Sequence, residues 1–254
     1  MAMAAGGTFL LRIEDIDQSR ARPEWEHQIY DDLHWLGIEW PEPVMRQSER
    51  QGAYDAALDK LWADGLLYPC TCSRADIAAA TSAPQEGAPL LGPDGIVYPG
   101  TCREKSDRLG SRPRGMTLRL DMRKAVAGIS ELRFTETGTA PAAVTVSCAE
   151  LIAQVGDAVL ARRDMGTSYH LSVVLDDAAQ DISHVVRGAD LFEATQIHVL
   201  LQRLLGMPTP IYHHHRLIRD ETGKRLAKRD DARAISLYRS EGMTPQGIRL
   251  KLGM

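Results

Sequence analysis

Hydrophobic positions in the first third of the chain follow strand and helix periods. The apolar run over residues 9–13 predicts a short strand that ends at an acidic turn. Apolar residues at helical spacing then predict a helix over residues 23–37, closed by its final glycine. A second helix is predicted from residue 54 to the Asp-Gly pair at 64–65, and the LLYPCTC stretch after it is predicted to be extended.

The middle of the chain differs from the first third in composition and in its hydrophobic pattern. Residues 81–95 are rich in Pro, Gly, Ala and Ser, which predicts a loop. Short alternating segments at 116–120 and 129–134 predict a small antiparallel element.

The last third again alternates strand and helix patterns. HLSVVLDDA (170–178) is a nearly continuous apolar run that predicts a buried parallel strand with polar groups at its carboxyl end, and SHVVRGADL (183–191) repeats the pattern. TQIHVLLQRLLG (195–206) predicts a helix, and IYHHHRLI (211–218) predicts another strand. Strand and helix patterns at both ends with a loop-rich segment between them predict an α/β nucleotide-binding type of fold with an insertion.

Composition is that of a globular protein. The chain has 254 residues, 44% of them hydrophobic and 25% charged, with a net charge of −4. It shows neither an apolar run long enough to span a membrane nor a secretory signal pattern. We therefore expect a cytoplasmic protein whose cysteines do not form disulfides. Binding of RNA through one local basic face remains compatible with this charge.

Three of the four cysteines bracket the predicted loop. Cys70-x-Cys72 precedes it and Tyr98-x-x-x-Cys102 follows it, so three thiols and one phenol are available. Zinc prefers four N, S or O donors in a tetrahedron. The spacing therefore predicts a zinc site, with buried apolar cysteines and a strand tyrosine as the alternative. Cys148 stands alone and is predicted to be a core residue.

Two acidic groups follow predicted strands. We interpret Glu14, Asp15 and Asp17 from the residues alone as a helix N-terminus, where the helix dipole favours acids. Ligand-binding carboxylates at the carboxyl end of a strand are the alternative. Asp176 and Asp177 are interpreted either as solvated loop residues or as residues of the same crevice.

Basic and aromatic residues add further candidates. Arg187, near the end of a predicted strand, could hold a carboxylate in a fork. His213–His215 alternate in direction along their strand, so we interpret them as surface and crevice residues, with metal binding as the lesser alternative. GKRLAKRD (223–230) is either a solvated charge run or a loop that handles anions.

Six segments in order resemble the catalytic core of glutamyl-tRNA synthetases, a family of class I aminoacyl-tRNA synthetases. They are LLRIEDID, YPCTC with YPGTC, SYHLSVVLDDA, HVVRGADL, LLQRLLG and IYHHHRLIRDETGKRLAKRD. The resemblance covers nearly the whole chain. The cysteine-tyrosine pattern, and the end of the chain soon after the basic loop, resemble the shorter paralogous family, the glutamyl-Q tRNA(Asp) synthetases.

The resemblance implies a class I synthetase fold of the α/β class. A Rossmann-type parallel sheet would carry an inserted zinc-containing connective segment, without an anticodon-binding domain. Residues 1–68 would form the first part of the catalytic domain, 69–155 the connective insertion, and 156–254 the second part with the basic loop.

The same resemblance implies the reaction. In that family glutamate is activated with ATP and attached to the queuosine base of tRNA(Asp). The expected partners are therefore glutamate, ATP with Mg²⁺, and tRNA(Asp) bearing queuosine, and the expected state is a monomer with one structural zinc ion.

The resemblance also implies roles for individual residues. RLAKR (225–229) resembles the mobile KMSKS signature loop, whose lysine steadies the ATP phosphates, and Lys228 falls on that lysine. Two positions depart from the signature, because Ala227 and Arg229 replace its serines. Glu14 would meet the ammonium group of glutamate, and Tyr169 and Arg187 would recognise its carboxylate. The implied loop residues are Arg225, Leu226, Ala227, Lys228 and Arg229, and the implied zinc ligands are Cys70, Cys72, Tyr98 and Cys102.

The first class I signature would lie upstream of GGTFLLRIED, and the chain as given starts after it. A misplaced start codon, a trimmed chain, or a protein that has lost adenylation would each explain this. We favour the first, because strands 9–13 and 173–175 would otherwise expose unpaired edges, and we expect the chain as given to fold poorly or to be inactive. Two alternatives to the glutamyl-Q reaction remain: a fragment of a conventional glutamyl-tRNA synthetase, and a non-catalytic zinc-containing RNA-binding remnant.

Overall fold

The computed structural model describes residues 1–81, 90–105, 108–219, 223 and 234–253. The chain forms two compact units, one combining residues 1–49 with 217–254 and the other spanning residues 50–216. No helix among the described residues is long and apolar enough to cross a lipid bilayer.

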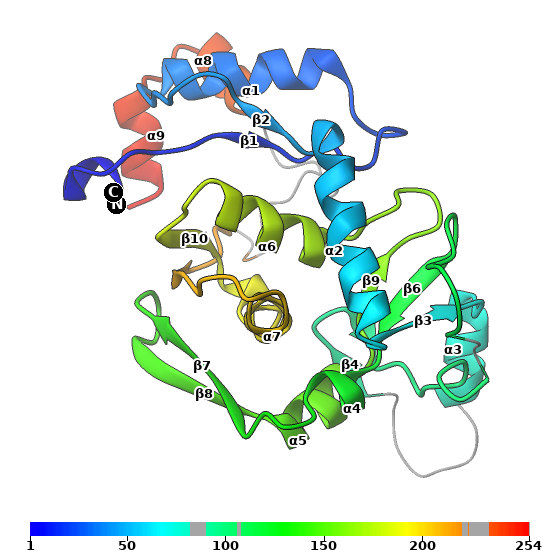
Figure 1. The fold of residues 1–254 in the computed structure, drawn as a ribbon. Coiled ribbons are helices and arrows are strands. Elements are labelled where there is room, and N and C mark those ends of the chain that lie inside the picture. Colours follow the sequence, from blue (N-terminus) through cyan, green and yellow to red (C-terminus); the bar gives the residue numbers. More distant parts are fainter. Residues whose placement is uncertain (82–89, 106–107, 220–222, 224–233, 254) are drawn as a thin grey trace. The chain divides into compact units, whose positions relative to one another are not determined.

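The first unit joins the two ends of the chain. Its short strands β1 and β2 pair in parallel, and helix α1 begins with proline in its first turn. Helix α8 lies beside α1 (Figure 1), where the Gln28 amide donates to Ser236 Oγ at 3.2 Å. The elements are β1 (Arg12–Ile13), α1 (Pro23–Trp35), β2 (Met45–Arg46), α8 (Ile235–Ser240), α9 (Pro245–Lys251) and the 3-10 turns η1 (Met3–Ala5) and η2 (Gln47–Arg50), the last at the border of the units.

The second unit contains two larger sheets and a small hairpin. A three-stranded antiparallel sheet has the order β3-β6-β9, and a four-stranded sheet has the order β10-β11-β7-β8. In the latter, β10 and β7 run parallel to β11, and β8 runs antiparallel to β7. The strands are β3 (Leu67–Cys70), β4 (Leu91–Gly92), β5 (Gly95–Ile96), β6 (Thr117–Leu120), β7 (Glu131–Glu136), β8 (Ala142–Ser147), β9 (Val159–Ala161), β10 (His184–Gly188) and β11 (Ile211–His215).

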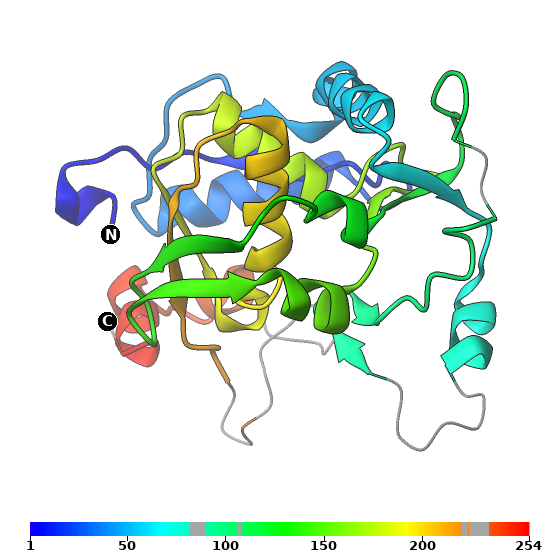
Figure 2. The same ribbon diagram turned by 60° about the horizontal axis from the view of Figure 1, so that its bottom comes forward.

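Helices α6 and α7 form the centre of the core of this unit. Both are buried over most of their length, and α7 packs beside the hairpin of β7 and β8 (Figure 2). The helices are α2 (Gln51–Ala63), α3 (Arg74–Thr81), α4 (Met122–Ala125), α5 (Cys148–Glu150), the π-helical turn η3 (Leu151–Val155), α6 (Tyr169–Ala179), the 3-10 turn η4 (Ala189–Leu191) and α7 (Thr195–Leu205).

Most predicted elements are confirmed, and one is wrong. The helices predicted over 23–37, 54–65 and 195–206 are α1, α2 and α7, and the strands at 183–191 and 211–218 are β10 and β11. The run at 170–178, predicted as a parallel strand, is helix α6. An apolar run does not distinguish a buried strand from a helix that is buried on all sides. Ser168, whose side chain caps α6 by accepting from Leu171 N, is the local signal for a helix.

Four further expectations change. Residues 173–175, expected as an exposed strand edge, are helical and buried, with Val174 only 1% exposed. The strand predicted over 9–13 is reduced to β1. Trp25 and Ile29, on the predicted apolar face of α1, remain 44% and 41% exposed. The antiparallel segments predicted at 116–120 and 129–134 exist, but they lie in different sheets, as β6 and β7.

Candidate functional site

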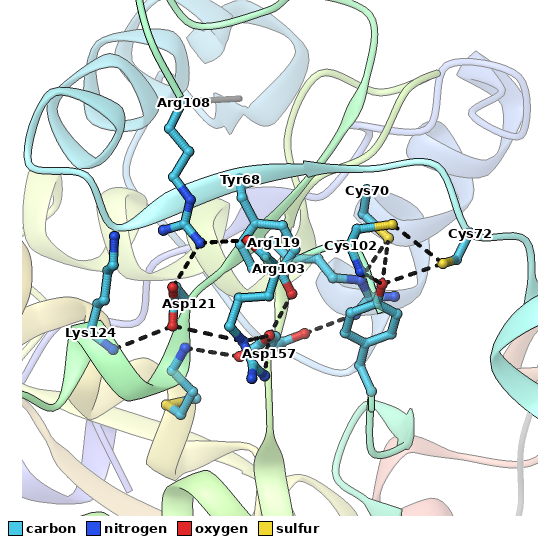
Figure 3. A network of polar contacts seen from close by, with 12 residues as sticks. Tyr68, Cys70, Cys72, Cys102, Arg103, Arg108, Arg119, Asp121, Lys124 and Asp157 are labelled. Atoms are coloured by element: carbon cyan, nitrogen blue, oxygen red, sulfur yellow. Dashed lines mark hydrogen bonds and ion pairs between the residues drawn. The ribbon is translucent and has the colours of Figure 1, made fainter. Parts of the chain in front are cut away.

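The three bracketing cysteines meet in the second unit. Strand β3 ends at Cys70, Cys72 follows two positions later, and the turn after Tyr98 brings Cys102 back to them. The three sulfurs lie within 4.8 Å of one another, with Cys72 and Cys102 Sγ 3.4 Å apart. Tyr98 Oη lies 3.5 Å from Cys70 Sγ and 3.3 Å from Cys72 Sγ. The four predicted ligands therefore form one cluster, whose three cysteines are labelled in Figure 3.

This donor set fits a zinc ion. Zn–S bonds of about 2.3 Å in a tetrahedron place sulfurs roughly 3.8 Å apart, close to the spacing found. Burial raises the pKa of the Tyr98 phenol, and the neighbouring thiols raise it further. Burial also raises the pKa of Cys102, but the hydrogen bonds it accepts from Tyr98 and Thr71 outweigh burial and bring it to about 6. A thiol that ionises near neutral pH is suited to metal binding.

A buried cation stands next to the cluster. Arg119 is 9% exposed, its Nε donates to Cys70 Sγ at 3.4 Å, and its guanidinium carbon lies 4.0 Å from the centre of the Tyr98 ring. Its Nη1 donates to the backbone oxygen of Asp157 at 2.8 Å. Because a zinc ion with three thiolates carries net negative charge, this arginine complements a loaded site.

Asp157 is the centre of the polar network that continues from the cluster (Figure 3). Its carboxylate accepts from Arg103 Nη2 at 2.6 Å, from Met122 N at 2.9 Å and from the Tyr68 hydroxyl. Arg103 directly follows Cys102, so this ion pair attaches the loop with the last cysteine to the core.

A second cluster surrounds Arg187, near the end of β10. Arg187 is paired in register with His214 of β11, and its Nε donates to His214 Nε2 at 3.1 Å. Its Nη1 lies 3.0 Å from His198 Nδ1, and its Nη2 donates to Thr195 Oγ1 at 2.7 Å. Helix α7 presents Thr195 and His198 on one face, at the i, i+3 spacing. Strand and helix together therefore fix the guanidinium.

Each histidine beside Arg187 has a second partner. His214 Nδ1 lies 2.5 Å from Glu136 Oε2, at the end of β7. His198 Nε2 lies 3.0 Å from His170 Nδ1. Burial lowers the pKa of His198 well below its usual value, and nearby His170 and Arg187 lower it further. Burial also lowers the pKa of His214, against the opposing effect of Glu136. Both rings are therefore neutral near pH 7.

Tyr169 belongs to the same cluster. Its ring meets the rings of His170 and His198 edge-on, with centroids 5.6 and 5.8 Å apart. The structure thus brings two of the predicted glutamate-binding residues, Tyr169 and Arg187, against His198. Both are half-buried, whereas His198 and His214 are each only 2% exposed.

The remaining predicted residues are placed otherwise. Glu14 lies in the first unit, where it accepts from Arg12 Nη2 at 3.0 Å. The acidic turn at 14–17 is not a helix N-terminus, because α1 begins only at Pro23, and Asp15 instead accepts from Ser48 N at 2.9 Å. The KMSKS-like loop lies outside the described residues: Arg225, Leu226, Ala227, Lys228 and Arg229.

For two polar residues the structure excludes one of the alternatives that the sequence left open. Asp176 is fully buried in α6 and accepts from Arg50 Nε and Tyr54 Oη, each at 2.8 Å, so it is not a solvated loop residue. His214, interpreted with its neighbours as a surface or crevice residue, is buried and contacts Arg187 and Glu136, so the surface alternative is excluded for it. Cys148 is half-buried and donates to Ile129 O at 2.9 Å, apart from the other cysteines.

Sequence reasoning missed several residues of these clusters. Glu136, His170 and His198 carry no local motif, and only the pairing of β7 with β11 and the packing of α7 bring them to Arg187. The i, i+3 spacing of Thr195 and His198 was a usable signal. Arg119 and Asp157 likewise become recognisable only through their contacts with the cysteine cluster.

Comparison with known proteins shows the family to which the chain belongs. Residues 1–253 match the family model of the catalytic domain of class I tRNA synthetases (E and Q). The chain therefore belongs to this family, and its α/β fold with a parallel sheet is that of a class I synthetase. It is a ligase of the aminoacyl-tRNA synthetase type.

Individual proteins of this class are similar to the chain to different degrees. The chain is 62% identical over 256 residues to the glutamyl-Q tRNA(Asp) synthetase of Rhodobacter capsulatus, across 100% of this chain and 91% of that protein. It is 40% identical over 253 residues to the enzyme of the same name from Geobacter sulfurreducens, across 99% and 74%. A solved glutamate tRNA ligase from Elizabethkingia meningosepticum matches with a TM-score of 0.65 and 26% identity, across 89% of this chain. The chain spans 46% of that longer ligase.

Proposed function

We propose that this chain activates glutamate with ATP and attaches it to the queuosine base of tRNA(Asp). The 62% identity to a glutamyl-Q tRNA(Asp) synthetase over the whole chain is the observation that carries the proposal. The position of Arg187 supports it, because open α/β sheets bind ligands at the carboxyl ends of their parallel strands. The lower identity to a glutamate tRNA ligase, 26%, makes a conventional synthetase the weaker alternative.

The proposed reaction has two steps. An oxygen of the glutamate α-carboxylate attacks the α-phosphorus of ATP, the bond to the β-phosphate breaks, and pyrophosphate leaves with Mg²⁺. A nucleophilic group of the queuosine base then attacks the activated carbonyl carbon and displaces AMP. The protein contributes by holding the reactants in line and by balancing the charge that develops on the phosphates.

Each predicted residue takes one role in this proposal. Arg187 and Tyr169 recognise a carboxylate of glutamate, and Glu14 meets its ammonium group. Lys228 steadies the ATP phosphates from the loop of residues 225–229. A lysine suits the last task, because its compact charge on a flexible stem can follow phosphates as they separate.

One zinc ion is proposed for the cysteine cluster. Cys70, Cys72, Tyr98 and Cys102 would hold it, and the ion would act structurally, by tying the end of β3 to the loop that follows Tyr98. Its contribution is therefore stability of this segment, with no step of the reaction passing through it. The cytoplasmic location and the monomeric state stay predictions.

Radiolabelled glutamate tests the proposal directly. The full chain is incubated with ATP and with tRNA(Asp) that either carries or lacks queuosine, and with tRNA(Glu) as a third substrate. Label retained only on queuosine-containing tRNA(Asp) is the result expected from this reaction, and absence of label from every tRNA is the result expected if the chain as given is inactive. Label on tRNA(Glu) would instead indicate a conventional glutamyl-tRNA synthetase, and RNA binding without any label would indicate a non-catalytic module.

Variants of the chain complete the experiment. Arg187→Gln removes the cation proposed to bind glutamate and is expected to abolish labelling. Arg163→Gln changes an exposed arginine outside the clusters and is the matched control. Equal labelling by both variants would contradict the role of Arg187.

A further inference from the structure

The positive charge of Arg187 is surrounded by neutral hydrogen-bond acceptors. Its guanidinium donates to His214 Nε2, His198 Nδ1, Thr195 Oγ1 and the backbone oxygen of Leu191. All four acceptors are neutral. Among the described residues, no carboxylate oxygen lies within ion-pair distance of Arg187. This differs from Arg103, Arg108 and Arg112 in the same unit, each of which pairs directly with an aspartate.

The two histidines separate Arg187 from acidic residues. His214 stands between Arg187 and Glu136, because its Nδ1 faces the carboxylate while its Nε2 accepts from the guanidinium. On the other side, His198 Nε2 faces His170, and His170 Nε2 lies 3.7 Å from Asp94 Oδ1. One consistent assignment of protons follows, in which every ring accepts on the side of Arg187 and donates on the far side.

The acceptors around the cation are buried more deeply than the cation itself. His198, His214 and Thr195 are each no more than 2% exposed, so water does not compete for their contacts. Arg187 itself is half-buried. A charge that is held among buried groups, without a direct counter-ion, attracts an anion strongly.

We propose that His198 and His214 are positioning residues that hold Arg187 through neutral acceptors and keep Glu136 and Asp94 away from it, so that the guanidinium pairs with the side-chain carboxylate of glutamate and glutamine is rejected. This inference rests on the proposed function and adds the source of its selectivity. The α-carboxylate loses its negative charge when its oxygen bonds to phosphorus. The side-chain carboxylate does not react and stays charged, so a fixed cation suits it better. Glutamine offers a neutral amide there and gains no ion pair.

Two nearly isosteric variants of His198 test the inference. His198→Gln supplies a neutral amide oxygen beside Arg187, whereas His198→Glu supplies a carboxylate of the same size. Binding of radiolabelled L-glutamate and L-glutamine to the full chain is measured by equilibrium dialysis. We expect His198→Gln to keep the preference for glutamate, and His198→Glu to weaken glutamate binding about tenfold or more while glutamine binding changes less than about threefold.

Thr195 provides a second pair in case a buried glutamate at position 198 prevents folding. Thr195→Asp places a carboxylate beside Nη2 from the first turn of α7, where the helix dipole tolerates it, and Thr195→Asn is its neutral match. Thr195→Asp is expected to lose the preference for glutamate over glutamine, and Thr195→Asn is expected to keep it. A purely structural role would weaken both amino acids equally in every variant.

The outcomes separate the inference from the proposed function. A wild-type chain that binds no glutamate would overturn the proposed function, and the inference with it. A wild-type chain that prefers glutamate, with folded His198→Glu or Thr195→Asp variants that keep the same ratio of glutamate to glutamine affinity, would overturn the inference alone.

Discussion

Arg187 and His214 occupy paired positions on the parallel strands β10 and β11, and the guanidinium Nε donates to His214 Nε2 at 3.1 Å. An imidazole nitrogen accepts a hydrogen bond only when it carries no proton, so this contact requires His214 to stay neutral. The same condition applies to His198, whose Nδ1 faces Arg187 Nη1 at 3.0 Å. The arrangement of the cluster therefore depends on pH.

Stability is expected to fall as the solution becomes acidic. The pKa values of His198 and His214 are lowered in the folded chain, chiefly by burial, so below about pH 6.5 the unfolded chain binds protons that the folded chain does not. Their contribution to stability is complete above that pH and is lost as pH falls toward the folded-state pKa values. In this range each histidine should lower the free energy of unfolding by roughly 1 kcal/mol for each unit by which the pH falls.

Urea unfolding at pH 7.5, 6.5 and 5.5 measures this effect. His198→Gln removes one of the two groups, so its free energy of unfolding should decline less steeply with acid than that of the wild type. His27→Gln, at an exposed position, is the control and should keep the wild-type slope. Identical slopes for all three chains would show that His198 is not held neutral by the fold.

Local spacing predicted one part of the site, and tertiary contacts supply the other. Cys70, Cys72, Tyr98 and Cys102 were predictable because short spacings and one loop bring them together. Glu136 and His198 were not, because they lie 51 and 11 positions from Arg187 in sequence and reach it only through strand order and helix packing. Apolar spacing predicted the helices α1, α2 and α7, and the predicted apolar face is buried in α2 and α7 but not in α1.

Helix α6 shows where pattern reasoning fails. Leu171, Val173, Val174 and Leu175 are all less than 8% exposed, so neither the strand period nor the helix period is visible in the run. Burial on all sides removed the alternation on which the prediction depended.

Metal content should depend on the clustered cysteines and not on Cys148. Cys72→Ser removes one thiol from the proposed tetrahedral set and should reduce bound zinc from about one ion per chain to well below half. Cys148→Ser changes a thiol that only donates to Ile129 O and should leave the content unchanged. Metal analysis of dialysed protein decides the matter, and equal zinc in both variants would exclude the cluster as the binding site.

The ion pair of Asp157 and Arg103 is expected to contribute strongly to folding. Asp157→Asn leaves Arg103, whose side chain is 12% exposed, with only the more distant Asp121 at 3.8 Å. Breaking a buried pair typically costs about 3 kcal/mol or more, because a charge stays buried without compensation. Chemical denaturation should show this loss in the free energy of unfolding.

Asp64→Asn is the matched control for this change. Asp64 pairs with Lys60 at 2.8 Å, but the two side chains are 45% and 53% exposed. Exposed pairs at this spacing contribute less than about 1 kcal/mol. If both variants lost the same small amount, the Asp157 network would not be the anchor of the loop after Cys102.

Two glycines should respond oppositely to replacement by alanine. A Cβ at Gly138 would lie 2.5 Å from His214 N and 2.7 Å from Glu136 Oε1, and would overlap His214 O. These atoms form the junction of β7 and β11, where Gly138 N donates to Glu136 Oε1 at 2.6 Å. Gly138→Ala must therefore displace backbone beside the Arg187 cluster. Overpacking of this kind costs about 1–3 kcal/mol or more.

Gly52 offers the contrasting case, in the first turn of α2. A Cβ there meets nothing within 4 Å, and the backbone is helical, so alanine fits without strain. Alanine also reduces the freedom of the unfolded chain, which should stabilise the protein by roughly 0.4–1 kcal/mol. Thermal unfolding should thus move to lower temperature for Gly138→Ala and to higher temperature for Gly52→Ala. Because Gly138 contacts both Glu136 and His214, its variant should also bind glutamate more weakly, and normal binding would show that the β7–β11 junction does not position Arg187.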